Sequence, residues 1–191
     1  MRCYGISDNM TTRKTKALGQ HFLKNPYVLR KIIDCISPQD QDLIIEIGAG
    51  KGALTFPLTE RAGKVVAIER DRELASFIRN KKIPNLVVLE ENVLHVNFRE
   101  IVRKEEPSLK PVKIVGNLPY SISSPILFTI YENKDLFSVC IFLLQKEVAE
   151  RICSLPGSKK FAPITILFQN VFEMDIRARI NPQRSPGSCD A

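Results

Sequence analysis

Three closely spaced glycines follow an apolar run in the first third of the chain. The stretch Leu43–Thr55 reads LIIEIGAGKGALT, with its glycines at Gly48, Gly50 and Gly52. Because glycine has no Cβ, this spacing lets the backbone turn sharply and approach a ligand, while the next helix directs its first N–H groups to the same place. The pattern predicts a buried strand that enters a nucleotide-binding turn at its carboxyl end.

A second apolar run, 64–69, ends in a carboxylate. Glu69 lies about 20 positions after Gly48, the spacing that places an acid at the tip of the neighbouring parallel strand. We therefore predict that Glu69 accepts hydrogen bonds from the ribose hydroxyls of the ligand.

The charge of Glu46 separates two classes of ligand. Gly48, Gly50 and Ala53 also satisfy the G-x-G-x-x-[GA] pattern of nicotinamide enzymes. A carboxylate at Glu46 would repel a pyrophosphate but suits a ligand that carries a sulfonium and an α-ammonium group, namely S-adenosylmethionine. The alternative is that Glu46 is a strand-end acid turned to solvent, and the sequence leaves both interpretations open.

Apolar runs alternate with helical patterns through most of the chain. We expect strands at 43–48, 64–69, 86–89, 112–116, 138–144 and 172–180, and helices from Pro26 to before Pro38 and over 52–61, 72–80, 124–131 and 146–153. Residues 91–111 are expected to be irregular, with one helical turn. This alternation predicts an α/β fold with a doubly wound, mostly parallel sheet, whose ligands bind beyond the carboxyl ends of the strands.

Composition and charge limit the remaining classes. The 191 residues suit one domain, and 28 Lys and Arg against 21 Asp and Glu give a net charge of +7, which favours a polyanionic partner. No apolar run is long enough for a membrane span, and the five cysteines have no metal-ligand spacing, so we expect a cytoplasmic protein without membrane or metal. Residues 1–18, which include Arg13, Lys14 and Lys16, are expected to form a loosely held basic arm with no strand or helix period.

The residues after the strand at 112–116 fit transfer to an aromatic amine. Such an amine is a poor nucleophile because its lone pair is delocalised into the ring. The side-chain oxygen of Asn117 and the carbonyl of Leu118 can both accept from the amine N–H groups and favour a pyramidal nitrogen. Pro119 would fix the turn and Tyr120 would stack on the base. Taken alone, these four residues are also compatible with an ordinary turn.

Four stretches together resemble one family. GQHFL at 19–23, EIGAGKG at 46–52, Glu69 and NLPY at 117–120 are similar, in the same order, to the motifs of the ribosomal RNA adenine dimethyltransferases that act on two adjacent adenosines of small-subunit rRNA. The resemblance implies a Rossmann-like methyltransferase domain over 19–180, S-adenosylmethionine as methyl donor, and small-subunit rRNA or a pre-ribosomal particle as partner. It also implies a monomer when the protein is complete.

The resemblance assigns roles to residues. It implies cofactor contacts from Gln20, His21, Leu23, Glu46, Gly48, Gly50, Glu69, Asn92 and Asn117, and a catalytic target-base site of Asn117, Leu118, Pro119 and Tyr120. Phe161 matches an aromatic position that lines the base pocket in relatives, and a core role fits it equally. Relatives usually place Asp where this chain has Asn92, whose amide oxygen can still accept a hydrogen bond.

The C-terminal part departs from the family pattern. The resemblance implies a last, antiparallel strand between those at 138–144 and 171–180, followed by a small helical domain. Residues 181–191 contain Pro182, Pro186 and Gly187 and no apolar alternation, so we expect a disordered tail that supplies neither. The expected result is a gap or displaced pairing with open strand edges, marginal stability, association and weak activity.

Three other functions remain open at this point. They are a related dimethyltransferase that acts on large-subunit rRNA and confers macrolide resistance, a non-catalytic RNA-binding factor for ribosome assembly, and a nicotinamide oxidoreductase. Retention of both Glu69 and the 117–120 motif favours a methyltransferase over the assembly factor, and the charge of Glu46 favours it over the oxidoreductase.

Overall fold

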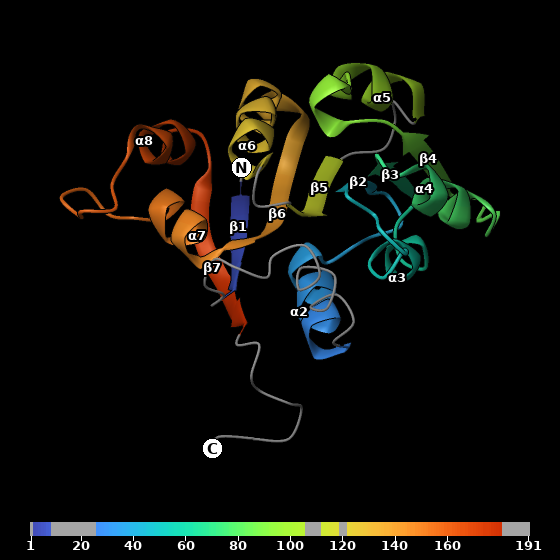
Figure 1. Ribbon diagram of the computed structural model, residues 1–191, viewed down its shortest axis with the longest axis horizontal. Coiled ribbons are helices and arrows are strands. Elements are labelled where there is room, and N and C mark those ends of the chain that lie inside the picture. Colours follow the sequence, from blue (N-terminus) through green and yellow to red (C-terminus); the bar gives the residue numbers. More distant parts are fainter. Residues whose placement is uncertain (1, 9–25, 106–111, 119–121, 181–191) are drawn as a thin grey trace.

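The chain forms one seven-stranded sheet with helices on both faces (Figure 1). The structure, a computed structural model, describes residues 2–8, 26–105, 112–118 and 122–180. All strand pairs in these ranges are parallel, and the strands lie in the order β4-β3-β2-β5-β6-β1-β7. Their bounds are β1 Arg2–Asp8, β2 Leu43–Ile47, β3 Lys64–Glu69, β4 Leu86–Glu90, β5 Val112–Asn117, β6 Phe137–Gln145 and β7 Glu173–Ile180.

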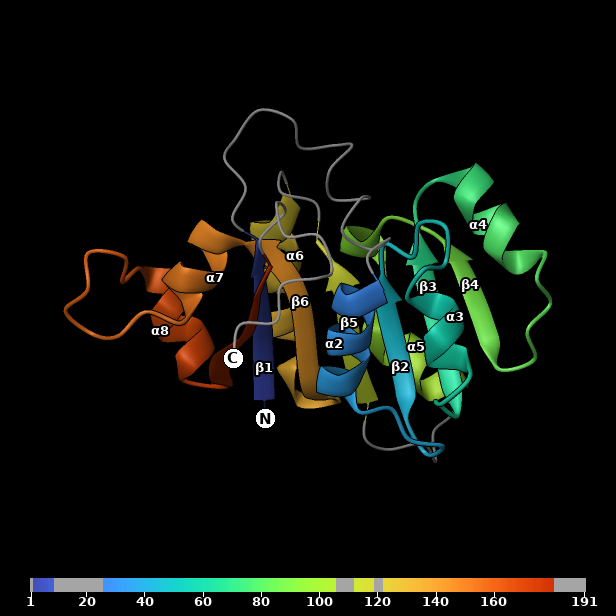
Figure 2. The same ribbon diagram turned by 90° about the horizontal axis from the view of Figure 1, so that it is seen from below.

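The helices cover the two faces in separate groups (Figure 2). On one face lie α2, α3 and α4, and on the other α5, α6, α7 and α8. Side chains of β2 divide accordingly, because Ile44 joins the core beneath α2 and α3 whereas Ile45 and Ile47 join the core beneath α5 to α8. The bounds are α2 Pro26–Ile36, α3 Thr55–Thr59, α4 Arg72–Arg79, α5 Phe98–Glu105, α6 Ser123–Glu132, α7 Lys146–Ile152 and α8 Pro163–Gln169, with short 3-10 helices η1 Val93–His95 and η3 Lys134–Leu136.

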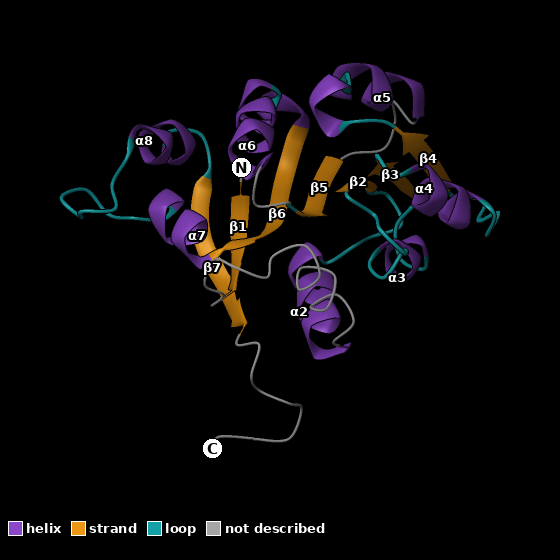
Figure 3. Cartoon of the chain, in the orientation of Figure 1, coloured by secondary structure: helices purple, strands orange, loops and turns teal. Residues whose placement is uncertain are grey.

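The predicted doubly wound parallel sheet is confirmed. Figure 3 shows strands and helices alternating along most of the chain, and β2 is buried at all of its positions, as a strand covered on both faces must be. The segment 91–111 is more regular than expected, because it contains η1 and the eight-residue helix α5. Helix α5 buries Phe98 and Ile101, which are three residues apart and therefore share one face.

The first strand departs from the sequence prediction. Residues 1–18 were expected to form a loosely held arm, but Arg2–Asp8 form β1, which is parallel to β6 on one side and to β7 on the other. Cys3 in this strand is only 3% exposed. The expectation is therefore wrong for residues 2–8, because pairing with two neighbours decides strand formation where local propensity does not. Residues 9–18 lie outside the described residues.

Strand β1 also corrects the expectation for the C-terminal half of the sheet. A gap or displaced pairing was expected beside the strand at 172–180, for want of an antiparallel insert. Instead β1 occupies the place between β6 and β7, where Cys3 lies opposite Cys140 and Met174. The predicted gap is wrong. Because β1 pairs with both β6 and β7, the facing edges of these two strands are not open, and the expected association through them no longer follows. Residues 181–191 lie outside the described residues.

Candidate cofactor and methyl-transfer site

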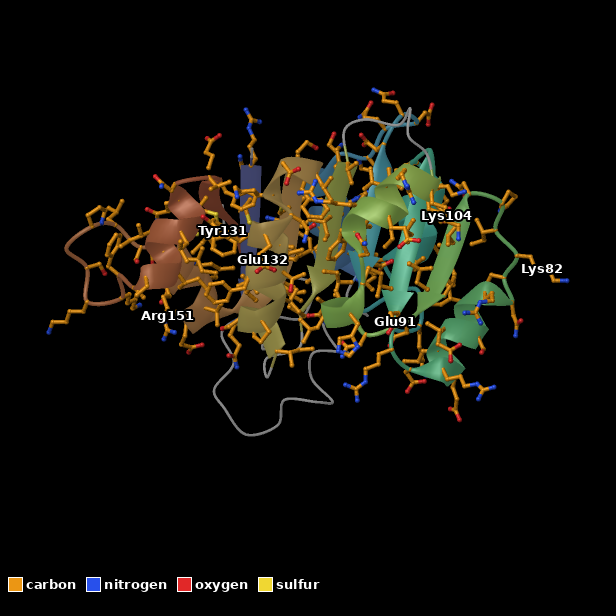
Figure 4. The ribbon with its side chains drawn as sticks, turned by 90° about the horizontal axis from the view of Figure 1, so that it is seen from above. Lys82, Glu91, Lys104, Tyr131, Glu132 and Arg151 are labelled. Carbon is orange, nitrogen blue, oxygen red and sulfur yellow. The ribbon has the colours of Figure 1, made fainter. Side chains whose placement is uncertain are left out.

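The carboxyl ends of four neighbouring strands bring the predicted ligand residues to one edge. Along this edge the strands β4, β3, β2 and β5 lie side by side, and at or just beyond their ends lie, in the same order, Asn92, Glu69, Gly48 and Asn117. The chain runs outward from β2 to β3 on one side and places β5 on the other, which is the switch point at which doubly wound sheets bind ligands. Figure 4 shows Glu91 at this ligand edge.

The glycine loop is open toward the ligand edge. Gly48 and Gly50 have φ values of 74° and 57°, a left-handed conformation that favours glycine. A Cβ at Gly50 would meet no atom within 4 Å, whereas one at Gly48 would lie 3.6 Å from the carbonyl oxygen of Asn117. The loop therefore has free space at Gly50 and directly adjoins the end of β5 at Gly48.

Glu69 is fixed by two backbone donors. Its Oε2 accepts from the Gly50 N–H at 2.8 Å, and its Oε1 accepts from the Asp71 N–H at 2.9 Å. The first bond ties the tip of β3 to the glycine loop on β2. Each carboxylate oxygen keeps acceptor capacity, so Glu69 can also receive hydroxyl donors from a ligand.

Glu46 is buried rather than turned to solvent. It is 2% exposed, and its Oε2 has no hydrogen-bond partner among the described residues. Burial raises the pKa of this carboxyl from 4.5 to about 7, an effect that the nearby Thr55 hydroxyl opposes and the charge of Glu69 reinforces. The solvent-facing interpretation of Glu46 is therefore wrong, and an uncompensated acid lies beneath the glycine loop.

Thr55 is a site residue that the sequence analysis missed. It is fully buried at the start of α3, and its Oγ1 has no hydrogen-bond partner of good geometry among the described residues. A hydroxyl beside a buried carboxyl supplies a donor when that carboxyl ionises. The available signal was the polar Thr55 inside an otherwise apolar ALTFPL stretch directly after the loop.

The buried state of Glu46 predicts how stability depends on pH. Because the folded pKa of about 7 lies above the unfolded value, the stabilisation it gives is complete below about pH 4 and is lost as pH rises to 7. Glu46→Gln has no carboxyl to ionise and so avoids this loss. The difference in free energy of unfolding between the variant and the wild type should therefore increase in favour of the variant by about 3 kcal/mol from pH 4 to pH 8. Chemical denaturation across this range measures the difference.

Glu60→Gln is the matched control, because Glu60 is exposed at the end of α3. Its curve should stay parallel to that of the wild type. If the Glu46→Gln curve also runs parallel, Glu46 is ionised in the folded protein without penalty and the assignment of a buried neutral acid fails.

The remaining predicted residues divide into described and undescribed ones. Asn92 Oδ1 accepts from the Leu94 N–H at 3.2 Å and so caps η1. Asn117 is half-buried at the end of β5, and Leu118 is 1% exposed, its N–H donating to the Leu143 carbonyl at 3.3 Å. Phe161 is half-buried. Gln20, His21, Leu23, Pro119 and Tyr120 lie outside the described residues.

The described residues contain neither a metal-binding cluster nor a membrane-spanning helix. No group of three or more His, Cys, Asp and Glu side chains in ranges 2–8, 26–105, 112–118 and 122–180 is arranged to hold a metal ion. Among the helices in those ranges, none has the length and apolar character needed to cross a membrane.

Comparison with known proteins gives one consistent family. Residues 11–186 match the family described as ribosomal RNA adenine dimethylase. The chain is 39% identical over 168 residues to the ribosomal RNA small subunit methyltransferase A of Leptothrix cholodnii, an alignment that covers 88% of this chain and 61% of the relative. The chain thus spans about three fifths of the length of this relative.

Solved structures agree in fold. A dimethyladenosine transferase from Plasmodium falciparum superimposes with a TM-score of 0.66 at 31% identity, covering 76% of this chain and 50% of that one. The 23S rRNA methyltransferase ErmE gives a TM-score of 0.61 at 24% identity, covering 80% of this chain and 65% of that one. The second likeness concerns the fold alone.

Proposed function

This chain belongs to the ribosomal RNA adenine dimethylase family, and on that premise we propose that it transfers methyl groups from S-adenosylmethionine to N6 of two adjacent adenosines in small-subunit rRNA. The relative from Leptothrix cholodnii, named as a small-subunit enzyme, supports this substrate over large-subunit rRNA. The proposal also has the complete protein act as a monomer in the cytoplasm.

The order of residues along the ligand edge supports the cofactor assignment. Asn92 would contact the adenine, Glu69 the ribose, and the loop at Gly48 and Gly50 the methionine portion, in the spatial sequence of their strands. The cofactor supplies a methyl group on a positively charged sulfur. Glu46 fits such a ligand, because the Oε2 of its buried carboxyl has no hydrogen-bond partner among the described residues and the carboxylate form gains from a nearby cation. Gln20, His21 and Leu23 belong to the proposed cofactor site by family resemblance.

One observation carries the proposed chemistry, namely the contact between the glycine loop and the end of β5. The carbonyl oxygen of Asn117 lies 3.6 Å from the position of a Cβ on Gly48, so the amine-binding residues adjoin the cofactor loop. Asn117 Oδ1 and the Leu118 carbonyl would accept from the target amine and direct its lone pair toward the methyl group. No proton has to leave before attack, so a strong base is unnecessary. Pro119 and Tyr120 are proposed to shape the turn and stack on the base.

Methyl transfer from labelled S-adenosylmethionine tests the proposal directly. Small-subunit particles and large-subunit rRNA are offered separately, and primer extension locates the modified bases. We expect transfer to adjacent adenosines of the small subunit. Transfer to large-subunit rRNA alone would contradict the substrate assignment, and RNA binding without any transfer would favour a non-catalytic assembly factor.

Replacement of Glu69 by alanine tests the ribose contact. The substitution removes the acceptor for ribose hydroxyls and the anchor of the Gly50 N–H, so we expect S-adenosylmethionine binding to weaken by about 1–3 kcal/mol. Calorimetry of the variant beside Glu60→Ala, which removes an equal charge at an exposed position remote from the edge, measures the effect. Equal affinities in the two variants would remove Glu69 from the cofactor site.

A further inference from the structure

Strand β1 lies inside the sheet although the family match does not include it. The match begins at residue 11, whereas β1 spans Arg2–Asp8 and pairs on both sides. Cys3 belongs to the core beneath α5 to α8. A loosely held terminal segment would be exposed to solvent. Because β1 is paired on both sides and buries Cys3, residues 2–8 are part of the folded domain.

β1 links β7 to the rest of the sheet. In the ranges that the structure describes, β7 pairs with β1 alone. Each residue of β1 lies opposite one of β6 between Val139 and Gln145, and the pairing with β7 shifts its register once, between Gly5 and Ile6. Without β1, two neighbouring strands would face each other with unpaired backbone N–H and C=O groups, which protein interiors rarely tolerate.

Helix α7 crosses β1 where the strand has its smallest residue. A Cβ built on Gly5 would lie 3.5 Å from the Cβ of Ala149 and 3.9 Å from the carbonyl oxygen of Asp175. These are ordinary van der Waals distances, so alanine fits, but a longer side chain would have to displace α7. Ala149 is 1% exposed, so the helix has little room to move.

β1 also borders the strand that supports the proposed reacting turn. Ile6 is the register partner of Leu143 in β6. The Leu143 carbonyl in turn accepts the Leu118 N–H at 3.3 Å. Backbone pairing therefore runs from β1 through β6 to the residue that follows Asn117.

We propose that residues 2–8 are a built-in strand donor, a segment outside the family-matched region that supplies the parallel strand between β6 and β7. The donor docks β7 and its preceding helix α8 on the sheet and holds the end of β6 beside Leu118. The proposal stands independently of the methyl-transfer reaction, because every observation behind it concerns pairing and packing.

Cys3 reports on docking of the strand in the full chain. Its thiol is buried when β1 is docked, as is that of its register partner Cys140. Under native conditions with a maleimide, we expect Cys3 to be modified at least about 100-fold more slowly than in denaturant, with modification read for each cysteine by mass spectrometry. Modification of Cys3 at the denatured rate while Cys140 stays protected would overturn the proposal.

A cross-link then tells whether the strand comes from the same molecule. Because both thiols are buried, the incubation with diamide has to be long enough for the slow reaction that the labelling experiment predicts. Diamide converts two thiols to a disulfide and takes up the two protons and two electrons, and register partners on adjacent strands are close enough for this bond. In an equal mixture of 14N and 15N chains, the peptides linked through Cys3 and Cys140 should each carry a single isotope. Linked peptides of mixed isotope would show exchange between copies and overturn a donor acting within one chain.

Two substitutions at Gly5 complete the test. Gly5→Ala should leave the labelling rate of Cys3 near that of the wild type, whereas Gly5→Leu should raise it about 10-fold or more, because the longer side chain meets α7. Equal rates in both variants would contradict the packing on which the proposal rests. If Gly5→Leu does not fold, the labelling and cross-linking of the wild-type chain still decide the question.

Discussion

Replacing Asn117 by alanine is expected to lower the rate of methyl transfer by about 100-fold or more, the loss typical when one preorganised hydrogen-bonding group is removed from a reacting centre. Asn117 lies at the end of β5, with its backbone carbonyl next to the glycine loop. Its side-chain oxygen is the proposed acceptor for the target amine, and alanine offers none. Single-turnover transfer from labelled cofactor to small-subunit rRNA measures the loss.

Two further variants separate this role from a general effect on the fold. Asn117→Asp keeps an acceptor oxygen and should retain more activity than the alanine variant. Asn170→Ala changes an exposed asparagine at the end of α8 and should leave transfer unchanged. A near-normal rate in Asn117→Ala, with its circular dichroism also normal, would remove Asn117 from the mechanism.

The elements that the sequence predicts correctly are those whose own residues carry a clear pattern. Strand β2 is apolar at every position except Glu46 because it is covered on both faces, and the glycines after it are where a left-handed turn is needed. Helix α5 was underestimated, since charged residues surround the two positions, Phe98 and Ile101, that it buries. Short amphipathic helices depend on such few positions that periodicity alone identifies them poorly.

Strand β1 is an element that its local sequence is insufficient to predict. The segment RCYGISD has a glycine at its centre and charged ends, so its intrinsic strand preference is weak. Its register partners in β6 and β7 lie more than 130 residues further along the chain, and only the structure shows that β1 fits between these two strands. A central strand supplied from the N-terminal end of the chain leaves no local pattern.

At the site, the position of the residues at strand ends could be predicted, but the burial of their side chains could not. The sequence placed Gly48, Glu69, Asn92 and Asn117 at strand ends, and the parallel order brings them to one edge. It left the environment of Glu46 open because an acid at a strand end is compatible with either solvent or core. Its burial depends on what packs above it from α3, which is a tertiary property.

A buried ion pair at the amino ends of β2 and β5, opposite the ligand edge, leads to the second prediction, a large loss of stability. Lys113 Nζ lies 2.6 Å from Asp42 Oδ2 and donates to the carbonyl oxygens of Ile36 at 3.1 Å and Ser37 at 2.8 Å. Lys113 thereby closes the end of α2 and joins it to the starts of β2 and β5. Lys113→Met should destabilise the protein by about 3–5 kcal/mol, because it leaves the carboxylate of Asp42 buried without its counter-charge. Urea denaturation measures the change.

The expected loss of stability comes from leaving the Asp42 carboxylate buried without its partner, and not from the net stabilisation that the ion pair provides. Asp42 is fully buried, and its Oδ1 already has no partner among the described residues. Once the ammonium is gone, the Gln39 N–H, which donates to Oδ2 at 2.8 Å, is the donor left to the charge in the described part of the chain, and it carries no counter-charge. Replacing both residues, as Lys113→Met with Asp42→Leu, should recover most of the stability that the single substitution loses. Lys104→Met, at an exposed position near the end of α5 (Figure 4), is the control and should change stability by less than about 0.5 kcal/mol. If Lys113→Met is no more harmful than Lys104→Met, water reaches Asp42 in the folded state and the end of α2 is held by its apolar contacts alone.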